Sequence, residues 1–547
     1  MIGVLAPDSD PRVVSEFFEL FKTPWEYRQP NRSYEVLLCV GQVNCERNAA
    51  KLVLHYASSR LSIDEHEGID VIEHNTSEVV SQNGRSLVIY GQHLSFCHSG
   101  TPIHSVERSG EPNSYRRIRD GATIERIGYD LFAEITHLLT VGQPEEFAEF
   151  PTLDLHISVL RDLIIRSGIE LLEIPPVPEG YGCMACLTHD IDHPGIRFHQ
   201  WDATAFGFLY RATVVSFAKF LGRRVSFQEL RRNWLAAIKL PLVYIGWAKD
   251  FWGGFESRYL EFENGIRPTY FVVPFANRPG IGINGSAPKR RATGYGAKDI
   301  RKPLLRIKAN GGEVALHGID AWHDSDSGRR ELEEVREITG DNELGVRMHW
   351  LYYGENSPKT LEDAGATYDS TVGYRATIGF RNGTAQAYRP LEAAHLLELP
   401  LHIMDTALFY PAYLGLSQGE AESHVREVIA AAAEVGGCVT VNWHDRSLAA
   451  ERNWHSSYRA LVDELKMRKA WFATAADAVA WFRMRRSVAF GMEELGNDTF
   501  HARITDIQNR NLPGLRLRRH KLDRGGAEAL PVSHHLDGRL EVAAESL

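Results

Sequence analysis

Two aspartates at the end of an apolar stretch are the clearest candidates for chemistry. The segment Leu187–Pro194 reads LTHDIDHP, so one residue separates Asp190 from Asp192 and a proline follows shortly after. If the stretch is a strand, residues two apart share a face, with Cα atoms roughly 6–7 Å apart. One carboxylate could then bind a metal ion while its neighbour acts as a base. The same pattern also fits a solvated strand end that is capped by aspartates.

A pair of histidines follows a second apolar stretch. His317 and His323 lie six residues apart, with Asp320 between them. Neutral imidazole is a common ligand of zinc and similar metals, and two histidines close in sequence can converge on one ion. A chain with 23 histidines also contains such pairs by chance. The position of the pair at a strand end is what favours a site.

Two further apolar runs end in polar residues of the same kind. The run 439–443 leads directly to His444, and Gly345–His349 has the same form and contains Arg347. A single histidine at a strand end is more often structural than catalytic. The interest of these residues depends on whether their strands end beside the aspartate pair.

The elements from Cys183 onward favour such a meeting point. Strand and helix signals alternate, which is typical of a parallel α/β sheet or barrel, and polar strand ends then gather at one edge. Amphipathic helices over 328–338 and 420–434 fit between strands. The expected strands are 183–188, 269–273, 313–317, 345–349, 398–403 and 438–443.

The chain is long enough for several domains. We expect a smaller α/β domain over residues 1–150 and a helical linker over 151–181, which ends in a loop rich in proline and glycine. A catalytic domain over 182–485 would carry an aromatic-rich helical insertion at 203–255. Residues 498–547 read as short polar-alternating strands, which could form a β appendage or a loosely ordered tail.

Bulk composition excludes some classes of protein. The 547 residues carry a formal net charge of −10, which argues against a general nucleic-acid binder. No apolar run is long enough to span a membrane, and the N-terminus lacks the features of a secretory signal. Six scattered cysteines are no disulfide framework. We therefore expect a bacterial-type cytoplasmic protein with reduced thiols.

The ordered series of motifs resembles the polysaccharide deacetylases, a carbohydrate esterase group that removes acyl groups from amino sugars. The likeness covers about residues 182 to 482, and the motifs occur in the family's order. The N-terminal region resembles uncharacterised domains that precede some deacetylases. The matching segments are Thr188–Pro194, Arg267–Val273, His317–His323, Arg347, Tyr368–Ser370 and His444. The resemblance implies an α/β fold whose C-terminal domain is a deformed (β/α) barrel, preceded by a smaller α/β domain.

The resemblance also implies a metal site. Asp192, His317 and His323 would bind a divalent metal, with zinc expected and cobalt, nickel or manganese as alternatives. The family's aspartates are adjacent, whereas Ile191 separates them here, and its histidines are four residues apart rather than six. Asp320 therefore competes with His323 for the place of the third ligand.

Four further residues receive catalytic roles from the resemblance. Asp190 would be the general base, and Arg347 would orient it and keep it ionised. His444 would protonate the leaving nitrogen, with Asp369 as a possible partner that sets its charge. Acid–base steps of this kind are typically worth about 10²–10⁴-fold each.

The predicted function is metal-dependent deacetylation of an N-acylated amino sugar or polysaccharide precursor. The alternatives are hydrolysis of another non-peptide C–N bond at the same site, or an inactive scaffold that binds glycan. A carbohydrate partner is expected, linked to a lipid or a nucleotide, and no nucleic acid. The segment Phe206–Leu221 mixes aromatic and basic residues, so it could be a lid, a core helix pair or a peripheral membrane contact.

Overall fold

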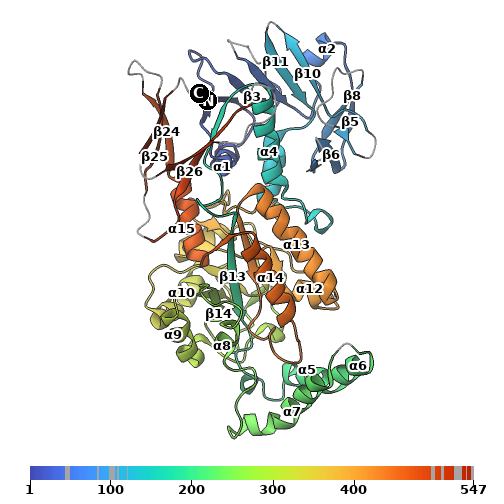
Figure 1. The fold of residues 1–547 in the computed structure, drawn as a ribbon, viewed down its shortest axis with the longest axis vertical. Helices are drawn as coiled ribbons and strands as arrows, with labels where there is room; N and C mark the ends of the chain where they lie inside the picture. Colours follow the sequence, from blue (N-terminus) through green and yellow to red (C-terminus); the bar gives the residue numbers. More distant parts are fainter. Residues whose placement is uncertain are drawn as a thin grey trace.

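A computed structural model describes most of the chain. The described residues are 1–43, 50–82, 85–97, 105–107, 110–119, 121–223, 225–493, 499–506, 510–522, 532–536 and 539–543. Figure 1 shows an elongated molecule with mostly β elements at one end, a layered α/β body in the middle and a helical hairpin at the other end.

The N-terminal part contains a six-stranded sheet in the order β10-β11-β4-β3-β1-β2, in which only the β10–β11 pair is antiparallel. Buried helix faces pack on it, as in α1, where Asp10 caps the N-terminus and the apolar residues fall on one face. The strands are β1 (Ile2–Leu5), β2 (Trp25–Tyr27), β3 (Val36–Val40), β4 (Leu52–Tyr56), β10 (Ser114–Arg119) and β11 (Ala122–Ile127). The helices are α1 (Pro11–Phe21), α2 (Ser62–His66), α3 (Leu131–Thr140) and α4 (Thr152–Arg166).

Small antiparallel sheets flank this part. β5 pairs with β8, and β6 pairs with both β7 and β9. These strands are β5 (Asp70–His74), β6 (Glu78–Gln82), β7 (Arg85–Ile89), β8 (His93–Cys97) and β9 (Ser105–Val106).

The body of the molecule is built on a parallel sheet in the order β20-β19-β18-β17-β14-β13-β22-β21, with β23 also paired to β13. Strands β13, β14 and β22 are buried throughout, as expected for a parallel sheet covered by helices. The strands are β13 (Cys183–Ile191), β14 (Thr269–Val272), β17 (Glu313–Gly318), β18 (Val346–Met348), β19 (Tyr368–Asp369), β20 (Leu397–Glu398), β21 (Ile403–Met404), β22 (Cys438–Asn442) and β23 (Ala470–Phe472).

The helices of the body lie between consecutive strands of the chain. They are α8 (Phe255–Tyr259), α9 (Arg301–Ala309), α10 (Ser325–Thr339), α11 (Ser357–Ala364), α12 (Asp405–Phe409), α13 (Gln418–Val435), α14 (His455–Met467) and α15 (Ala475–Arg486). The predicted helices over 328–338 and 420–434 are confirmed by α10 and α13. A short hairpin of β15 (Ile281–Gly282) and β16 (Gly285–Ser286) lies in a loop.

The two edges of the parallel sheet are joined by a single segment, so the sheet curls. β20 is at one edge and β21 at the other, and only four residues separate them in the chain. Between them, the Leu401 N–H donates to the Val372 carbonyl on one side and the His402 N–H donates to the Thr440 carbonyl on the other. The predicted strand over 398–403 is therefore wrong in its middle, because this segment crosses from one edge to the other. The parallel sheet of the body is therefore curled. The predicted (β/α) barrel is confirmed as a curled parallel sheet and no further.

A helical hairpin follows β13. It comprises α5 (Ala203–Tyr210), a π-helical turn at Arg211–Val215, α6 (Ser216–Leu221) and α7 (Phe227–Tyr244). Ser226 and Glu229 form a capping box at the start of α7. The hairpin lies crosswise at the end of the molecule toward which β13 runs (Figure 1).

Further strands follow α15. β24 (Val488–Glu493), β25 (Thr499–Ile504) and β28 (Arg539–Ala543) form one sheet, and β12 (Leu171–Glu173), β26 (Leu515–His520) and β27 (Val532–Leu536) form another. The predicted strands over 500–504, 515–520 and 538–543 match β25, β26 and β28, although residue 538 and the proposed boundary at 498 lie outside the described residues. Because β12 precedes the parallel sheet and β26 follows it, distant parts of the chain meet here.

Two expectations from composition can be compared with the structure. Cys97, Cys183, Cys186 and Cys438 are free, but Cys39 is disulfide-bonded, so the expectation of reduced thiols is wrong for Cys39. Among the described residues, none of the helices is both long and apolar enough to cross a membrane.

Candidate metal centre

The polar residues predicted at strand ends gather at the carboxyl edge of the parallel sheet. Asp190 lies near the end of β13 and Asp192 just beyond it, while His317 lies on β17. His349 directly follows β18, and His444 follows β22. These strands are neighbours or next neighbours in the sheet order, and all are parallel, so their ends lie at one edge.

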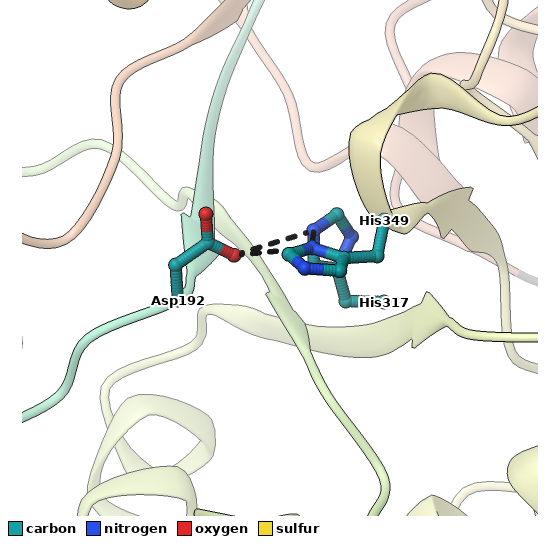
Figure 2. Close-up of side chains that lie close together, drawn as sticks. All are labelled: Asp192, His317 and His349. Carbon is teal, nitrogen blue, oxygen red and sulfur yellow. Dashed lines mark hydrogen bonds and ion pairs between the residues drawn. The ribbon is translucent and has the colours of Figure 1, made fainter. Parts of the chain in front are cut away.

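Three ligating side chains converge there: Asp192, His317 and His349. The Asp192 Oδ1 atom lies 3.5 Å from the His317 Nε2 atom and 3.4 Å from the His349 Nδ1 atom. The two ring nitrogens are 3.0 Å apart. Both histidines are buried and the aspartate is partly buried. Figure 2 shows both imidazoles on the same side of the Asp192 carboxylate.

Backbone carbonyls fix the orientation of both imidazoles. The His317 Nδ1 atom lies 2.9 Å from the Arg347 carbonyl oxygen, and the His349 Nε2 atom lies 2.9 Å from the Arg291 carbonyl oxygen. A carbonyl only accepts, so these outer nitrogens carry the hydrogens, and in neutral rings the inner nitrogens carry lone pairs. Burial lowers the pKa of His349, which favours the neutral ring.

The inner atoms fit a divalent metal. The two inner nitrogens are 3.0 Å apart, and their lone pairs repel each other unless a proton or a cation lies between them. The Asp192 Oδ1 atom is buried and has no hydrogen-bond donor among the described residues. Ligands bound tetrahedrally to one zinc ion at about 2.0–2.2 Å stand roughly 3.3–3.6 Å apart, which is close to the separations found here. Two neutral histidines and one carboxylate, with the histidines held by second hydrogen bonds, form a donor set typical of such sites.

A second carboxylate lies beside these ligands but is held differently. Asp190 is buried, and its Oδ1 atom accepts a hydrogen bond of 3.1 Å from the Arg347 guanidinium. Its Oδ2 atom accepts one of 2.7 Å from the Asn442 side-chain amide. Burial alone would raise the pKa of Asp190, but nearby groups that are or can become positively charged, among them His317 and Arg347, outweigh it and lower the pKa below its ordinary value. Asp190 is therefore an ionised carboxylate at the edge of the site.

His444 completes the cluster from the other side. Its Nδ1 atom lies 2.6 Å from Asp405 Oδ1, and its Nε2 atom lies 3.9 Å from Asp192 Oδ2. Asp405 is also held by the His444 backbone N–H at 2.8 Å and by the Ser447 hydroxyl. Burial would lower the pKa of His444, but the Asp405 carboxylate, with Asp192 and Asp190, outweighs it and raises the pKa to about 10. His444 can therefore hold a proton beside the ligands.

The structure does not bring His323 to this cluster. Its partly exposed ring lies 3.3 Å from Asp320 Oδ1, on the loop beyond β17. The reason is the path of that loop, because Glu331 of α10 accepts the backbone N–H groups of Ile319 and Asp320 at 2.8 Å each and turns the chain aside. Asp320 is likewise engaged with the Ile281 N–H at 2.7 Å. His349, rather than His323, lies beside Asp192 and His317.

Asp369 is also not beside His444. It pairs in register with Glu398 across β19 and β20, and its carboxylate accepts from the Thr371 hydroxyl. The partner of His444 is Asp405, which begins α12. Asp405 was not predicted, and its sequence context contains no motif that would identify it. Asn442 and His349 lay inside runs already singled out, so their strand-end positions were a usable signal.

Comparisons with known proteins find only distant structural likenesses. No family model matches this chain, and no curated protein matches it. A protein of Mycobacterium smegmatis assigned as a polysaccharide deacetylase is 20% identical with a TM-score of 0.35, covering 57% of this chain and 95% of its own. A protein of Parabacteroides distasonis assigned as a glycoside hydrolase/deacetylase is 12% identical with a TM-score of 0.31, covering 68% and 87%. A glycoside hydrolase family 57 branching enzyme of Thermococcus kodakaraensis is 9% identical with a TM-score of 0.29, covering 55% and 71%. Likenesses this distant assign no activity.

Proposed function

We propose that this protein is a metal-dependent hydrolase that removes the acyl group from an N-acylated amino sugar. The observation that carries the proposal is the cluster at one sheet edge, where three convergent ligands lie between an ionised carboxylate and a protonated histidine. Asp192, His317 and His349 supply the ligands, Asp190 the carboxylate and His444 the proton. Metal-assisted amide hydrolysis uses each of these parts.

The metal would be held by Asp192, His317 and His349. A divalent ion bound there supplies Lewis-acid polarisation of the acyl carbonyl and lowers the pKa of water. Zinc suits the two imidazoles and one carboxylate, and cobalt, nickel and manganese are the alternatives. The Arg347 and Arg291 carbonyls orient the two rings from outside.

The protein's own residues handle the protons. Asp190 accepts the proton of the attacking water, because it is ionised and lies next to the ligands. Arg347 and Asn442 each hold one of its oxygens, which fixes the direction of the carboxylate. His444 donates a proton to the departing nitrogen from its Nε2 atom, while Asp405 holds its Nδ1 atom. Acid–base groups of this kind contribute about 10²–10⁴-fold each.

The substrate class is supported by the order of the sequence motifs, which resembles that of the polysaccharide deacetylases. An N-acylated amino sugar presents a secondary amide whose nitrogen leaves as an amine. That leaving group needs a proton, which His444 would provide. The linkage of the sugar, whether to a lipid or to a nucleotide, is the finer part of this proposal.

The test is release of carboxylic acid from a panel of N-acylated sugars. The full chain is stripped of metal with a chelator, reloaded with zinc, cobalt, nickel or manganese, and assayed. We expect turnover only after reloading, and only with N-acylated sugars. His349→Ala should abolish both metal binding and turnover, whereas the matched variant His323→Ala should keep both. Turnover of formylated amines or ring amides alone would identify a different C–N hydrolase. Absence of metal binding by the reloaded wild type would contradict the proposal.

A further inference from the structure

The helical hairpin at the end of the molecule exposes an unusual amount of apolar surface. More than half of the exposed large apolar side chains in the described part of the chain lie between residues 201 and 247. Soluble proteins seldom leave apolar side chains in a contiguous exposed patch without a binding partner. The packing of the hairpin within the protein therefore does not explain its exposed apolar side chains.

Each arm of the hairpin has two apolar faces. One face is buried, where Phe208, Ala212, Leu240 and Val243 pack with residues of the body that include Trp252. The opposite face is exposed and follows helical spacing in both arms. In the first arm the exposed residues are Phe206, Tyr210, Val214, Phe217 and Leu221; in the second they are Phe227, Trp234, Leu235, Ile238, Leu242 and Ile245. A helix that is apolar on both sides is expected to be covered on both sides.

The two exposed faces adjoin and are flanked by tryptophans. The rings of Phe217 on α6 and Trp234 on α7 lie 6.0 Å apart, so the faces meet between the helices. At the base of the hairpin, Trp201 is 81% exposed and Trp247 is 82% exposed. Tryptophan is enriched where a protein meets the headgroup region of a membrane, because its ring is apolar and its N–H is polar.

The charge of the hairpin has the opposite sign to that of the whole protein. The protein has a formal net charge of −10, but the described residues between 201 and 249 include seven basic and only two acidic ones. The two acidic residues each have a partner, Asp202 with His199 at 2.8 Å and Glu229 with Asn453 at 2.8 Å, and the Asp202 side chain is 44% exposed. The exposed basic residues are Lys219, Arg223, Arg231, Arg232, Lys239 and Lys249.

We propose that the hairpin docks the protein on an anionic lipid surface. Apolar side chains would enter the boundary of the bilayer while the basic side chains contact lipid phosphates, as in amphipathic helices that lie on membranes. A second copy of the chain fits less well, because the like-charged faces of two hairpins would repel each other. The hairpin lies crosswise at the end of the body toward which β13 runs (Figure 1), a position from which it could lie flat on a surface. The docking does not depend on the proposed hydrolase activity.

Sedimentation of the whole 547-residue chain with vesicles tests the proposal. We expect binding to vesicles that contain phosphatidylglycerol, little binding to pure phosphatidylcholine, and weaker binding as NaCl rises from about 0.05 M to 0.5 M. Arg231→Glu/Arg232→Glu should weaken binding by at least about tenfold, because each basic residue near an anionic surface contributes about 1 kcal/mol. The matched control Arg301→Glu/Lys302→Glu reverses two exposed charges at the start of α9 and should bind as the wild type does.

A second pair of variants tests the apolar contribution. Ile238→Ser/Trp247→Ser should also lose at least about tenfold, since both side chains are exposed in the free protein and would become buried in lipid. The control Ile118→Ser/Met467→Ser changes two equally exposed apolar residues elsewhere and should have no effect. Wild-type protein that ignores anionic vesicles, or hairpin variants that bind like the wild type, would overturn the proposal. A concentration-dependent dimer that these hairpin variants abolish, without vesicle binding, would assign the face to a second copy instead.

Discussion

Two clusters of ionisable groups lie on the same parallel sheet and are built in different ways. One cluster lies at the ends of β13, β17 and β18, where Asp192, His317 and His349 converge. The inner nitrogens of the two imidazole rings point toward each other. On β19 and β20, Asp369 and Glu398 lie side by side in register and are fully buried. The first cluster combines different donor types, whereas the second consists of two carboxyl groups.

The difference lies in what would satisfy each cluster. Burial raises the pKa of Asp369 to about 6, and burial with the neighbouring Asp369 raises the pKa of Glu398 well above its ordinary value. A single proton shared by the two acids is enough for them, because like charges in one buried site cannot both ionise. In the first cluster a proton shared between the two inner ring nitrogens would still leave the buried Asp192 Oδ1 atom without a donor. A cation would satisfy the first cluster, whereas a shared proton satisfies the second.

The largest effect is expected from removing a ligand. His349→Ala should weaken zinc binding by more than about 100-fold, since even loss of an outer partner of a ligand costs about 10–100-fold. Turnover should fall with it. The measurement is metal content after dialysis against a zinc buffer, with His323→Ala as the control that keeps full occupancy. Loss of metal from the His323 variant and not from the His349 variant would reverse the ligand assignment.

The next largest effect should distinguish the roles of the two neighbouring aspartates, Asp190 and Asp192. Asp190→Asn should slow turnover by about 10²–10⁴-fold while zinc content stays near that of the wild type, because Asp190 is held by Arg347 and Asn442 rather than by the ligand set. Asp192→Asn should lose zinc. Zinc titration and steady-state kinetics on both variants decide the roles. An Asp190 variant without metal beside an Asp192 variant with metal would contradict them.

His444 provides a smaller and substrate-dependent effect. His444→Ala should leave zinc content intact and slow hydrolysis of an N-acylated sugar by about 10²–10⁴-fold. The loss should be smaller on an activated aryl ester, whose leaving group needs little protonation. Asp405→Asn should show the same pattern more weakly, because it acts through His444. Equal losses on both substrates would indicate that His444 positions the substrate instead.

The sequence alone predicts some of these residues and misses others. Asp190, Asp192, His317, Arg347 and His444 could be placed at one sheet edge because parallel strands end together. The third ligand could not, because the spacing of His317 and His323 does not reveal how the chain leaves β17. That path is set by hydrogen bonds from Glu331, a residue of the next helix.

The partner of His444 was beyond sequence reasoning for a similar reason. Asp405 lies 39 residues before His444 and reaches it only because β21 and β22 pair in the sheet. The segment 398–403 is predicted as one strand because most of its residues are apolar. Hydrophobic pattern identifies buried segments, but it does not show which neighbour each half of the segment bonds.

The carboxyl pair gives the smallest effect, which concerns stability and its dependence on pH. The pKa of Asp369 is raised to about 6 in the folded protein, so the folded state holds a proton that the unfolded state releases near pH 4. The stability contribution of the protonated pair is therefore present below about pH 4 and is lost as the pH rises through about 6. Asp369→Asn removes this ionisation but keeps a group that can donate to or accept from Glu398. Its unfolding free energy relative to the wild type should rise between pH 4 and pH 8 by about 1–3 kcal/mol, measured by urea denaturation. Asp326→Asn, at an exposed position on α10, is the matched control. Parallel curves for the Asp369 variant and the wild type would mean that the pair does not share a proton, and the contrast with the ligand cluster would fail.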